Sequence, residues 1–323
     1  SDQVKQRYGG GFVWDRTVTS HYPDQGLRLP YHKYLDRPEI MERFAISPDN
    51  PRVCKYASRY LSDDEALGLV EQFLVSVDEL QQIGDTTEDW GARKKWLQNL
   101  IGNLWNNRGL YPGLPSVLEV LDFSDAIEYF MNEAIEGREQ EAADAVFAVV
   151  EGKSKKIPGV KIDEDALRKL SRAWRLKSKE EQALLKDILP RFEIEAGQIE
   201  AILSEKRSEN GLSASLKEIA ANPYLLAEQY AGNNQDDIIP WGRIDRGALP
   251  SPELGGENLV DLDDPRRMRS LAVQCLQREG AHTFLPAAHL TQQINQRISV
   301  LPEYKRHVFT DRYWEVDAEL LGE

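Results

Sequence analysis

Apolar positions recur every three or four residues along most of the chain after residue 61, which is the spacing of helices that bury one face. Ser62 and Glu65 have the spacing of a capping box, and apolar residues between 67 and 80 continue that first helix. Gly84 interrupts the pattern, and Trp96 and Trp105 lie on the apolar face of a second predicted helix, where we expect both indoles in the core. Further helices are predicted over 124–135, 140–150, 163–174, 179–189, 196–207, 223–230, 264–278 and 287–300.

The first sixty residues differ from the rest of the chain. Five prolines, at positions 23, 30, 38, 48 and 51, exclude a long helix there. A short strand is expected near Phe12 and Trp14, and the neighbouring tyrosines indicate an arm packed on a helical body. Near the other end, 312–316 is predicted as a strand, or as a segment that pairs with a part of the protein outside this sequence.

These patterns predict a mainly α, multi-helix protein of two or three subdomains with few short strands. The expected division is an irregular N-terminal arm over 1–60, an acidic helical domain over 61–150, a basic region over 151–262 and a helical segment over 263–323. The sequence begins without Met in the middle of a folded pattern, so we expect a fragment of a longer protein.

The composition is that of an ordinary globular protein and excludes few classes. Hydrophobic residues make up 41% of the 323 residues and charged residues 29%, as in ordinary globular proteins. No apolar run approaches the roughly 18 residues of a membrane span, and no signal peptide is visible, so a cytoplasmic protein is expected. The two cysteines, Cys54 and Cys275, are too few for a disulfide scaffold or a cysteine-based zinc site.

Charge is distributed unevenly along the chain. The net charge is −14, which argues against a protein that coats DNA over its whole surface. Residues 61–150 hold 18 acidic and 5 basic residues, whereas residues 151–180 hold 10 basic and 5 acidic ones. Any nucleic-acid contact is therefore expected to be local, and the alternative is that this basic stripe is only a solvated helix face.

Two Pro-Gly turns resemble the helix-hairpin-helix motif, in which backbone N–H groups at a turn and a helix N-terminus hold one DNA phosphate. The turn at Pro112-Gly113 has Pro115 where the motif has a second glycine, and its surroundings are acidic, so a structural role is expected. The turn at Pro158-Gly159 lies inside the basic stripe, where a phosphate contact and an ordinary surface turn both remain open.

A third, looser hairpin is expected across 192–197 and 211–213, with Ser213 or Ser215 capping the helix that follows. Asn222 is expected to cap a helix that begins at Pro223. The candidate DNA-binding residues of the chain all lie in the basic stripe: Lys153, Lys155, Lys156, Pro158, Gly159, Lys161, Arg168, Arg172 and Arg175.

Familiar catalytic motifs are absent from the sequence. There is no Walker phosphate loop, no zinc-protease or serine-hydrolase motif and no dinucleotide-binding fingerprint. His282 and His289 are separated by Pro286 and make a poor metal pair, so neither a metal nor a cofactor is expected. An enzyme of another type remains open, because no residue pattern singles out its active site.

Four short segments, taken in order, resemble the helical accessory region that precedes the motor in RecD-like superfamily 1 DNA helicases. They are 222–226 (NPYLL), 239–246 (IPWGRIDR), 265–271 (PRRMRSL) and 280–286 (GAHTFLP). The resemblance covers about residues 190–300 and implies a non-catalytic region of an ATP-dependent DNA helicase or helicase–nuclease, acting in DNA repair or defence. Its implied partners are the DNA backbone and the motor domains of the same or another chain.

Three arginines begin the predicted helix 264–278. Cations in a first helical turn oppose the helix dipole, which indicates a use beyond local stability. Ion pairs with Asp261, Asp263 or Asp264 are one explanation, but the resemblance favours docking onto the motor by Arg266, Arg267 and Arg269. The alternative function for the whole chain is a protein–protein scaffold that binds a partner through its acidic region and does not touch DNA.

Overall fold

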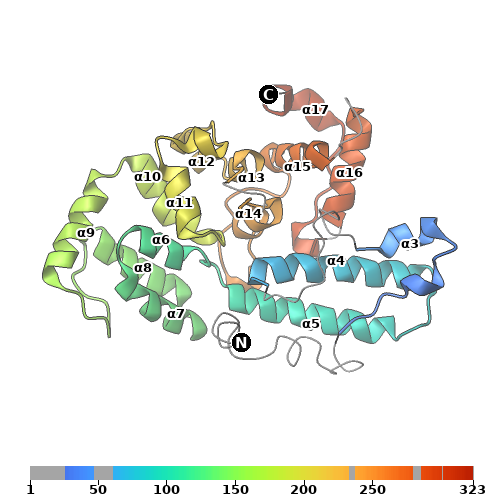
Figure 1. Cartoon of the computed structure of the whole chain (residues 1–323), viewed down its shortest axis with the longest axis horizontal. Coiled ribbons are helices and arrows are strands. Elements are labelled where there is room, and N and C mark those ends of the chain that lie inside the picture. The colour runs from blue at the N-terminus through green and yellow to red at the C-terminus, as the bar shows by residue number, and fades with distance from the viewer. Residues whose placement is uncertain (1–25, 47–60, 233–236, 279–284, 300, 323) are drawn as a thin grey trace, which may run out of the picture. The chain divides into compact units, whose positions relative to one another are not determined.

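The computed structural model describes residues 26–46, 61–232, 237–278, 285–299 and 301–322. The chain divides into two compact units, Ser1–Leu104 and Trp105–Glu323, and the division falls inside helix α5. The described residues form sixteen α-helices, α3 to α18, with short 3-10 and π-helical turns and no β-strand (Figure 1). The predicted mainly α, multi-helix fold is confirmed.

The first unit contains the 3-10 turn η1 (Tyr31–Lys33), α3 (Pro38–Phe44), α4 (Asp63–Gln82) and most of α5 (Trp90–Arg108). The predicted capping box is present: the Ser62 hydroxyl accepts from the Glu65 backbone N–H, and the Glu65 carboxylate accepts from the Ser62 N–H. Helix α3 packs on α4 over a core that includes Phe44, Val77 and Leu80.

The second unit contains the remaining helices around one hydrophobic core that extends from Leu114 to Phe309. Within it, α14 contacts both α13 and α15, and α9 contacts α8 and lies at the outer edge (Figure 1). The helices are α6 (Leu114–Val120), α7 (Ile127–Ile135), α8 (Glu139–Val150), α9 (Glu164–Leu176), α10 (Lys179–Ala183), α11 (Ala196–Leu203), α12 (Leu216–Ala221), α13 (Leu225–Gln229), α14 (Trp241–Ala248), α15 (Pro265–Arg278), α16 (Ala287–Ser299), α17 (Arg312–Val316) and α18 (Ala318–Gly322).

Several expectations need correction. Residues 312–316 form helix α17 rather than a strand. The boundaries drawn at 150 and 262 fall within the second unit, where a single core crosses both. Trp105 is buried as predicted, whereas Trp96 is only partly buried. The strand expected near Phe12 and the turn at 280–284 lie outside the described residues.

No helix in the described ranges is long and apolar enough to cross a membrane.

Candidate nucleic-acid interface

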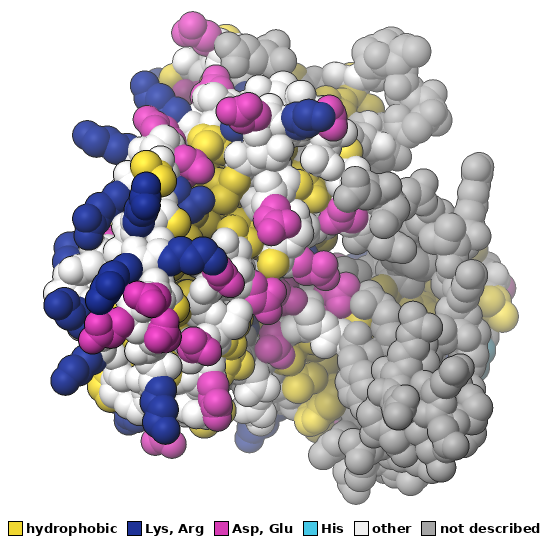
Figure 2. Space-filling view, turned by 60° about the vertical axis from the view of Figure 1, so that its left-hand side comes forward, with side chains coloured by type: hydrophobic (Ala, Val, Ile, Leu, Met, Phe, Trp, Pro, Cys, Tyr) yellow, Lys and Arg dark blue, Asp and Glu magenta, His cyan; other side chains and the backbone are white. Residues whose placement is uncertain are grey.

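Helix α9 carries the basic stripe on its outward face because its other face is anchored in the core. Leu170, Ser171 and Trp174 are its buried residues. The Trp174 indole packs against Phe147 of α8 with ring centroids 6.1 Å apart. Lys and Arg side chains gather on the side of the second unit where α9 lies, with fewer acidic side chains among them (Figure 2). The apolar pattern of α9 therefore determines which way its cations point.

All nine predicted contact residues lie on the surface. Each is exposed, from Lys153 in the loop after α8 to Arg175 in the last turn of α9. The structure thus brings the cations of the loop and the helix onto one exposed region, which we call the basic surface: Lys153, Lys155, Lys156, Lys161, Arg168, Arg172 and Arg175.

Ion pairs divide the basic surface into two groups. Lys153 pairs with Glu151, and Arg168 lies 3.1 Å from a Glu164 oxygen and 3.4 Å from an Asp165 oxygen. The other five cations form no ion pair with any described residue: Lys155, Lys156, Lys161, Arg172 and Arg175. Those five charges are therefore the ones available to an external anion.

The Pro158-Gly159 turn does not have helix-hairpin-helix geometry. Helix α8 ends at Val150 and α9 begins only at Glu164, so a long loop rather than a tight turn joins them. The Asp163 carboxylate accepts hydrogen bonds from the Asp165 and Ala166 N–H groups, at 3.0 and 3.1 Å, and two further acids occupy the first turn. An anion at this helix N-terminus would meet an occupied and negatively charged site. Of the two roles left open for this turn, the structure therefore favours the ordinary surface turn.

The Pro112-Gly113 turn has the structural role predicted for it, although by an unexpected means. The Glu139 carboxylate accepts from the backbone N–H groups of Leu110 and Tyr111, at 2.7 and 2.8 Å. Gly109 has φ 67° and a Cβ there would lie 2.6 Å from that carboxylate. Burial raises the pKa of Glu139, although the two backbone hydrogen bonds lower it. An internal carboxylate thus fills the position that a phosphate occupies in a DNA-binding hairpin.

In the third hairpin, Ser215 rather than Ser213 caps the next helix, through a reciprocal capping box with Glu218. The Asn222 side chain accepts from the Tyr224 N–H at 3.2 Å, but Asn222 ends α12 and does not cap a helix that begins at Pro223, so that expectation is wrong. The helix itself begins at Leu225.

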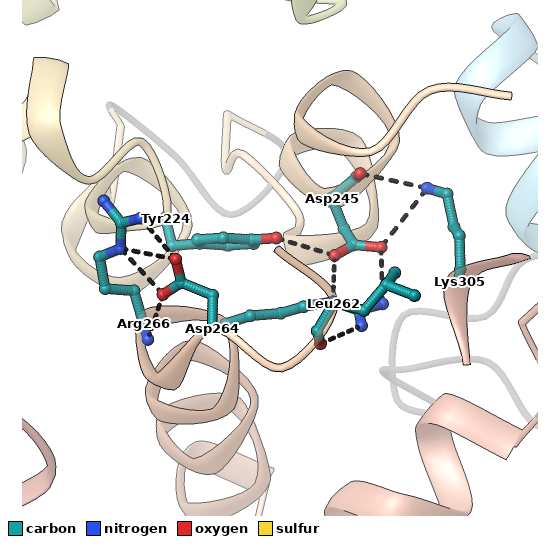
Figure 3. A network of polar contacts seen from close by, with 7 residues as sticks. Tyr224, Asp245, Leu262, Asp264, Arg266 and Lys305 are labelled. Carbon is teal, nitrogen blue, oxygen red and sulfur yellow. Dashed lines mark hydrogen bonds and ion pairs between the residues drawn. The ribbon is translucent and has the colours of Figure 1, made fainter. Parts of the chain in front are cut away.

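A second polar site is buried in the core around Asp245 of α14. Its carboxylate accepts hydrogen bonds from the Arg267 guanidinium of α15, with Nε 2.7 Å from Oδ1, and from the Tyr224 hydroxyl at 2.9 Å (Figure 3). Lys305 Nζ lies 3.1 Å from the Asp245 carbonyl oxygen and 3.4 Å from Oδ2. All three side chains of the ion-paired group are at most 1% exposed. Burial alone would raise the pKa of Asp245, but Lys305 and Arg267 hold it below its ordinary value.

The three arginines expected to dock onto a motor all have partners inside this chain. Arg267 is fully buried and also donates to the Leu262 carbonyl at 3.1 Å, so the docking role predicted for it is wrong. Arg266 pairs with Asp264 and donates to the Ala221 carbonyl, and Arg269 lies 3.6 Å from Glu228. Nearby carboxylates thus offset the dipole penalty of the first turn. Asp264 is one of the partners expected from the sequence, whereas Asp245 and Glu228 are not.

No cluster of three metal-ligating side chains occurs in the described part of the chain. A pocket of about 500 Å³ borders α13 and α15 and includes Glu228, Tyr230, Gln274 and Gln277. Burial raises the pKa of Glu228 from 4.5 to about 7, although Arg269 opposes the shift. A smaller pocket of about 450 Å³ next to α17 is lined partly by His307, Tyr313 and Asp317. In this second pocket, the His307 Nε2 lies 3.0 Å from the Tyr313 hydroxyl oxygen.

Comparison with known proteins adds one distant relative. The uncharacterized protein MJ1519 of Methanocaldococcus jannaschii is 25% identical over 306 residues, which cover 85% of this chain. The chain spans about a quarter of the length of that relative. No protein-family model and no solved structure matches the chain.

Proposed function

We propose that this chain binds the phosphate backbone of DNA, without sequence specificity and without catalysis, through the five unpaired cations of its basic surface. The observation that carries the proposal is their arrangement: Arg172 and Arg175 project from a helix anchored by its opposite face, and three lysines lie in the preceding loop. Side chains held in one region with no internal carboxylate suit the regularly spaced charges of a phosphate backbone.

The overall charge limits the contact to this region. A chain with a net charge of −14 repels a polyanion everywhere except at a local excess of cations. Binding is therefore expected to be weak, with dissociation constants on the order of 10⁻⁴ to 10⁻⁶ M at physiological salt. A longer protein would gain affinity by combining this contact with others, and the relative that the chain matches is about four times as long.

The narrower proposal is that the chain is the accessory region of a RecD-like ATP-dependent DNA helicase or helicase–nuclease and docks onto its motor. It rests on the order of the four sequence segments. Within them, the buried Asp245–Arg267 pair joins the second segment to the third. The second and third segments thus stabilise the folded core. Docking onto the motor would then use surface residues outside the Asp245 network.

Fluorescence anisotropy with a labelled 20-base-pair duplex and the matching single strand tests the proposal. We expect binding at about 50 mM KCl that weakens steeply with salt, with a slope of log K against log [KCl] of about −3 to −5 for the duplex if most of the five cations contact phosphates. Failure to bind either DNA at low salt would contradict the proposal and favour the protein–protein scaffold.

A further inference from the structure

The pocket of about 500 Å³ beside α13 and α15 has the size of sites that hold small organic molecules. Its α15 wall includes Gln274 and Gln277, which follow Ser270 by four and seven residues and therefore lie with it on one face of the helix. Ile238 and Pro240, both exposed, form an apolar part of the wall. The pocket thus combines uncovered apolar surface with amide side chains.

Glu228 lines this pocket as a buried acid with an unsatisfied oxygen. Its side chain is 3% exposed, and one carboxylate oxygen, Oε2, lies 3.6 Å from the Arg269 Nε, too far for a hydrogen bond. Burial raises the pKa of this carboxyl, whereas Arg269 and the nearby Ser270 lower it. Neither the Glu228 Oε1 nor the Ser270 hydroxyl oxygen has a hydrogen-bond partner among the described residues. Because buried polar atoms are almost always hydrogen-bonded, this carboxyl lacks a donor that a ligand would supply.

Gln274 supplies a donor of known polarity. Its side-chain oxygen accepts a hydrogen bond from the Arg297 Nη1, and because a guanidinium only donates, the amide oxygen must face it. The amide nitrogen Nε2 donates to no described residue. Gln274 follows Ser270, the neighbour of Glu228, by about 6 Å along the helix axis. The pocket therefore offers an acceptor at Glu228 and a donor at Gln274, about one helical turn apart.

These two groups restrict the chemistry of a ligand. An ammonium group would suit Glu228 but would meet the Arg269 charge and leave the Gln274 donor unused, and an anion would be repelled by Glu228. A cyclic amide has an N–H donor beside a carbonyl acceptor and no charge to desolvate. We propose that this pocket binds a neutral cyclic amide, such as the uracil ring, whose N–H donates to Glu228 and whose carbonyl oxygen accepts from Gln274. The ring lies against Ile238 and Pro240, and the site is separate from the basic surface of α9.

Isothermal titration calorimetry of the chain with uridine tests the proposal. For a ligand of this size we expect a dissociation constant on the order of 10⁻³ to 10⁻⁴ M. The matched ligand is 3-methyluridine, which keeps the ring and both carbonyls but lacks the N–H. It should bind at least about tenfold more weakly, because the buried acceptor of the site is then left unpaired. No detectable binding of uridine, or equal binding of the two nucleosides, would overturn the proposal.

A variant of Gln274 then locates the site. Gln274→Glu keeps the shape and the acceptor for Arg297 but removes the amide donor, so it should weaken uridine binding about tenfold. Gln292→Glu, at an exposed position of α16 outside the pocket, adds the same charge and should bind uridine like the parent. Thermal melts establish that both variants are folded. If Gln274→Glu binds uridine as tightly as the parent, or if both variants lose the same affinity, the assignment to this pocket is wrong.

Discussion

Arg267 and Asp245 form an ion pair that no solvent reaches, with the guanidinium Nε 2.7 Å from the carboxylate Oδ1. Lys305, from a turn near the end of the chain, joins the same carboxylate at 3.4 Å. One acidic side chain therefore balances two buried cations that come from different parts of the sequence. Breaking such a group by removing one partner is far more costly than breaking a surface pair, because charge is left buried without compensation.

Replacing Asp245 with Asn should therefore destabilise the protein strongly. We expect a loss of about 3–5 kcal/mol in the free energy of unfolding, measured by urea denaturation at neutral pH. Asp165→Asn, at an exposed carboxylate that pairs only with Arg168, is the control and should change stability by less than about 1 kcal/mol. Similar stabilities for the two variants would show that the buried network contributes little.

Arg266 and Arg267, at the start of α15, should differ in their contribution to stability because only Arg267 is fully buried. Arg267→Ala leaves Lys305 as the one cation paired with Asp245 among the described residues, and it opens a cavity beside Trp241, over whose ring the guanidinium lies at 5.7 Å. Arg266 is 32% exposed and bonded to Asp264, so Arg266→Ala should cost only about 1 kcal/mol. The melting temperatures of the parent and of Arg266→Ala should be similar, and the melting temperature of Arg267→Ala should be well below both. The reverse order would contradict the structural role of Arg267.

Because the pKa of Glu228 is raised, the stability of the protein should depend on pH between 4.5 and about 7. Its value of about 7 in the folded protein, against 4.5 ordinarily, means that the folded state holds a proton that the unfolded state has released. The stabilisation from this group is therefore complete below pH 4.5 and is lost as pH rises through 7. Urea denaturation across pH 4.5–8 should show this fall in the parent.

Glu228→Gln removes the titrating group while keeping its shape, so it serves as the matched variant. The difference in stability between variant and parent should grow from pH 4.5 to 7 in favour of the variant and then level off. A difference that does not change with pH would mean that Glu228 titrates normally.

The absence of a Walker phosphate loop from the sequence predicts that the purified chain does not hydrolyse ATP. A coupled assay with and without DNA should give no turnover above that of a blank. DNA-stimulated turnover that follows the protein through two purification steps would contradict the non-catalytic assignment.

Local sequence signals predicted much of the helical structure. The capping box at Ser62 and the apolar spacing of α9 depend only on neighbouring residues, and both were correct. The strand predicted over 312–316 is wrong: aromatic residues favour strands locally, but in the folded chain this segment forms helix α17. The Trp314 Nε1 donates to the Thr291 hydroxyl of α16 at 2.8 Å, a partner that no local pattern reveals.

The candidate site was predictable only in the features that depend on local sequence. Exposure of the basic surface follows from the periodicity of α9, but ion pairing does not: Lys169 pairs with Asp122, which is distant in sequence. Likewise, no local pattern reveals that Asp245, on another helix, is the partner of Arg267, so the sequence alone favours a docking role for this arginine.

The central claim is that the unpaired cations of the basic surface hold DNA, and charge reversal at Arg172 and Arg175 tests it most directly. The measurement is the salt dependence of duplex affinity for Arg172→Glu/Arg175→Glu, compared with the parent and with Arg168→Glu. The double variant should fold normally, because both side chains are exposed, and should lose about two units of salt slope together with most of its affinity at low salt. A folded double variant that binds duplex DNA with the affinity and slope of the parent would contradict the claim.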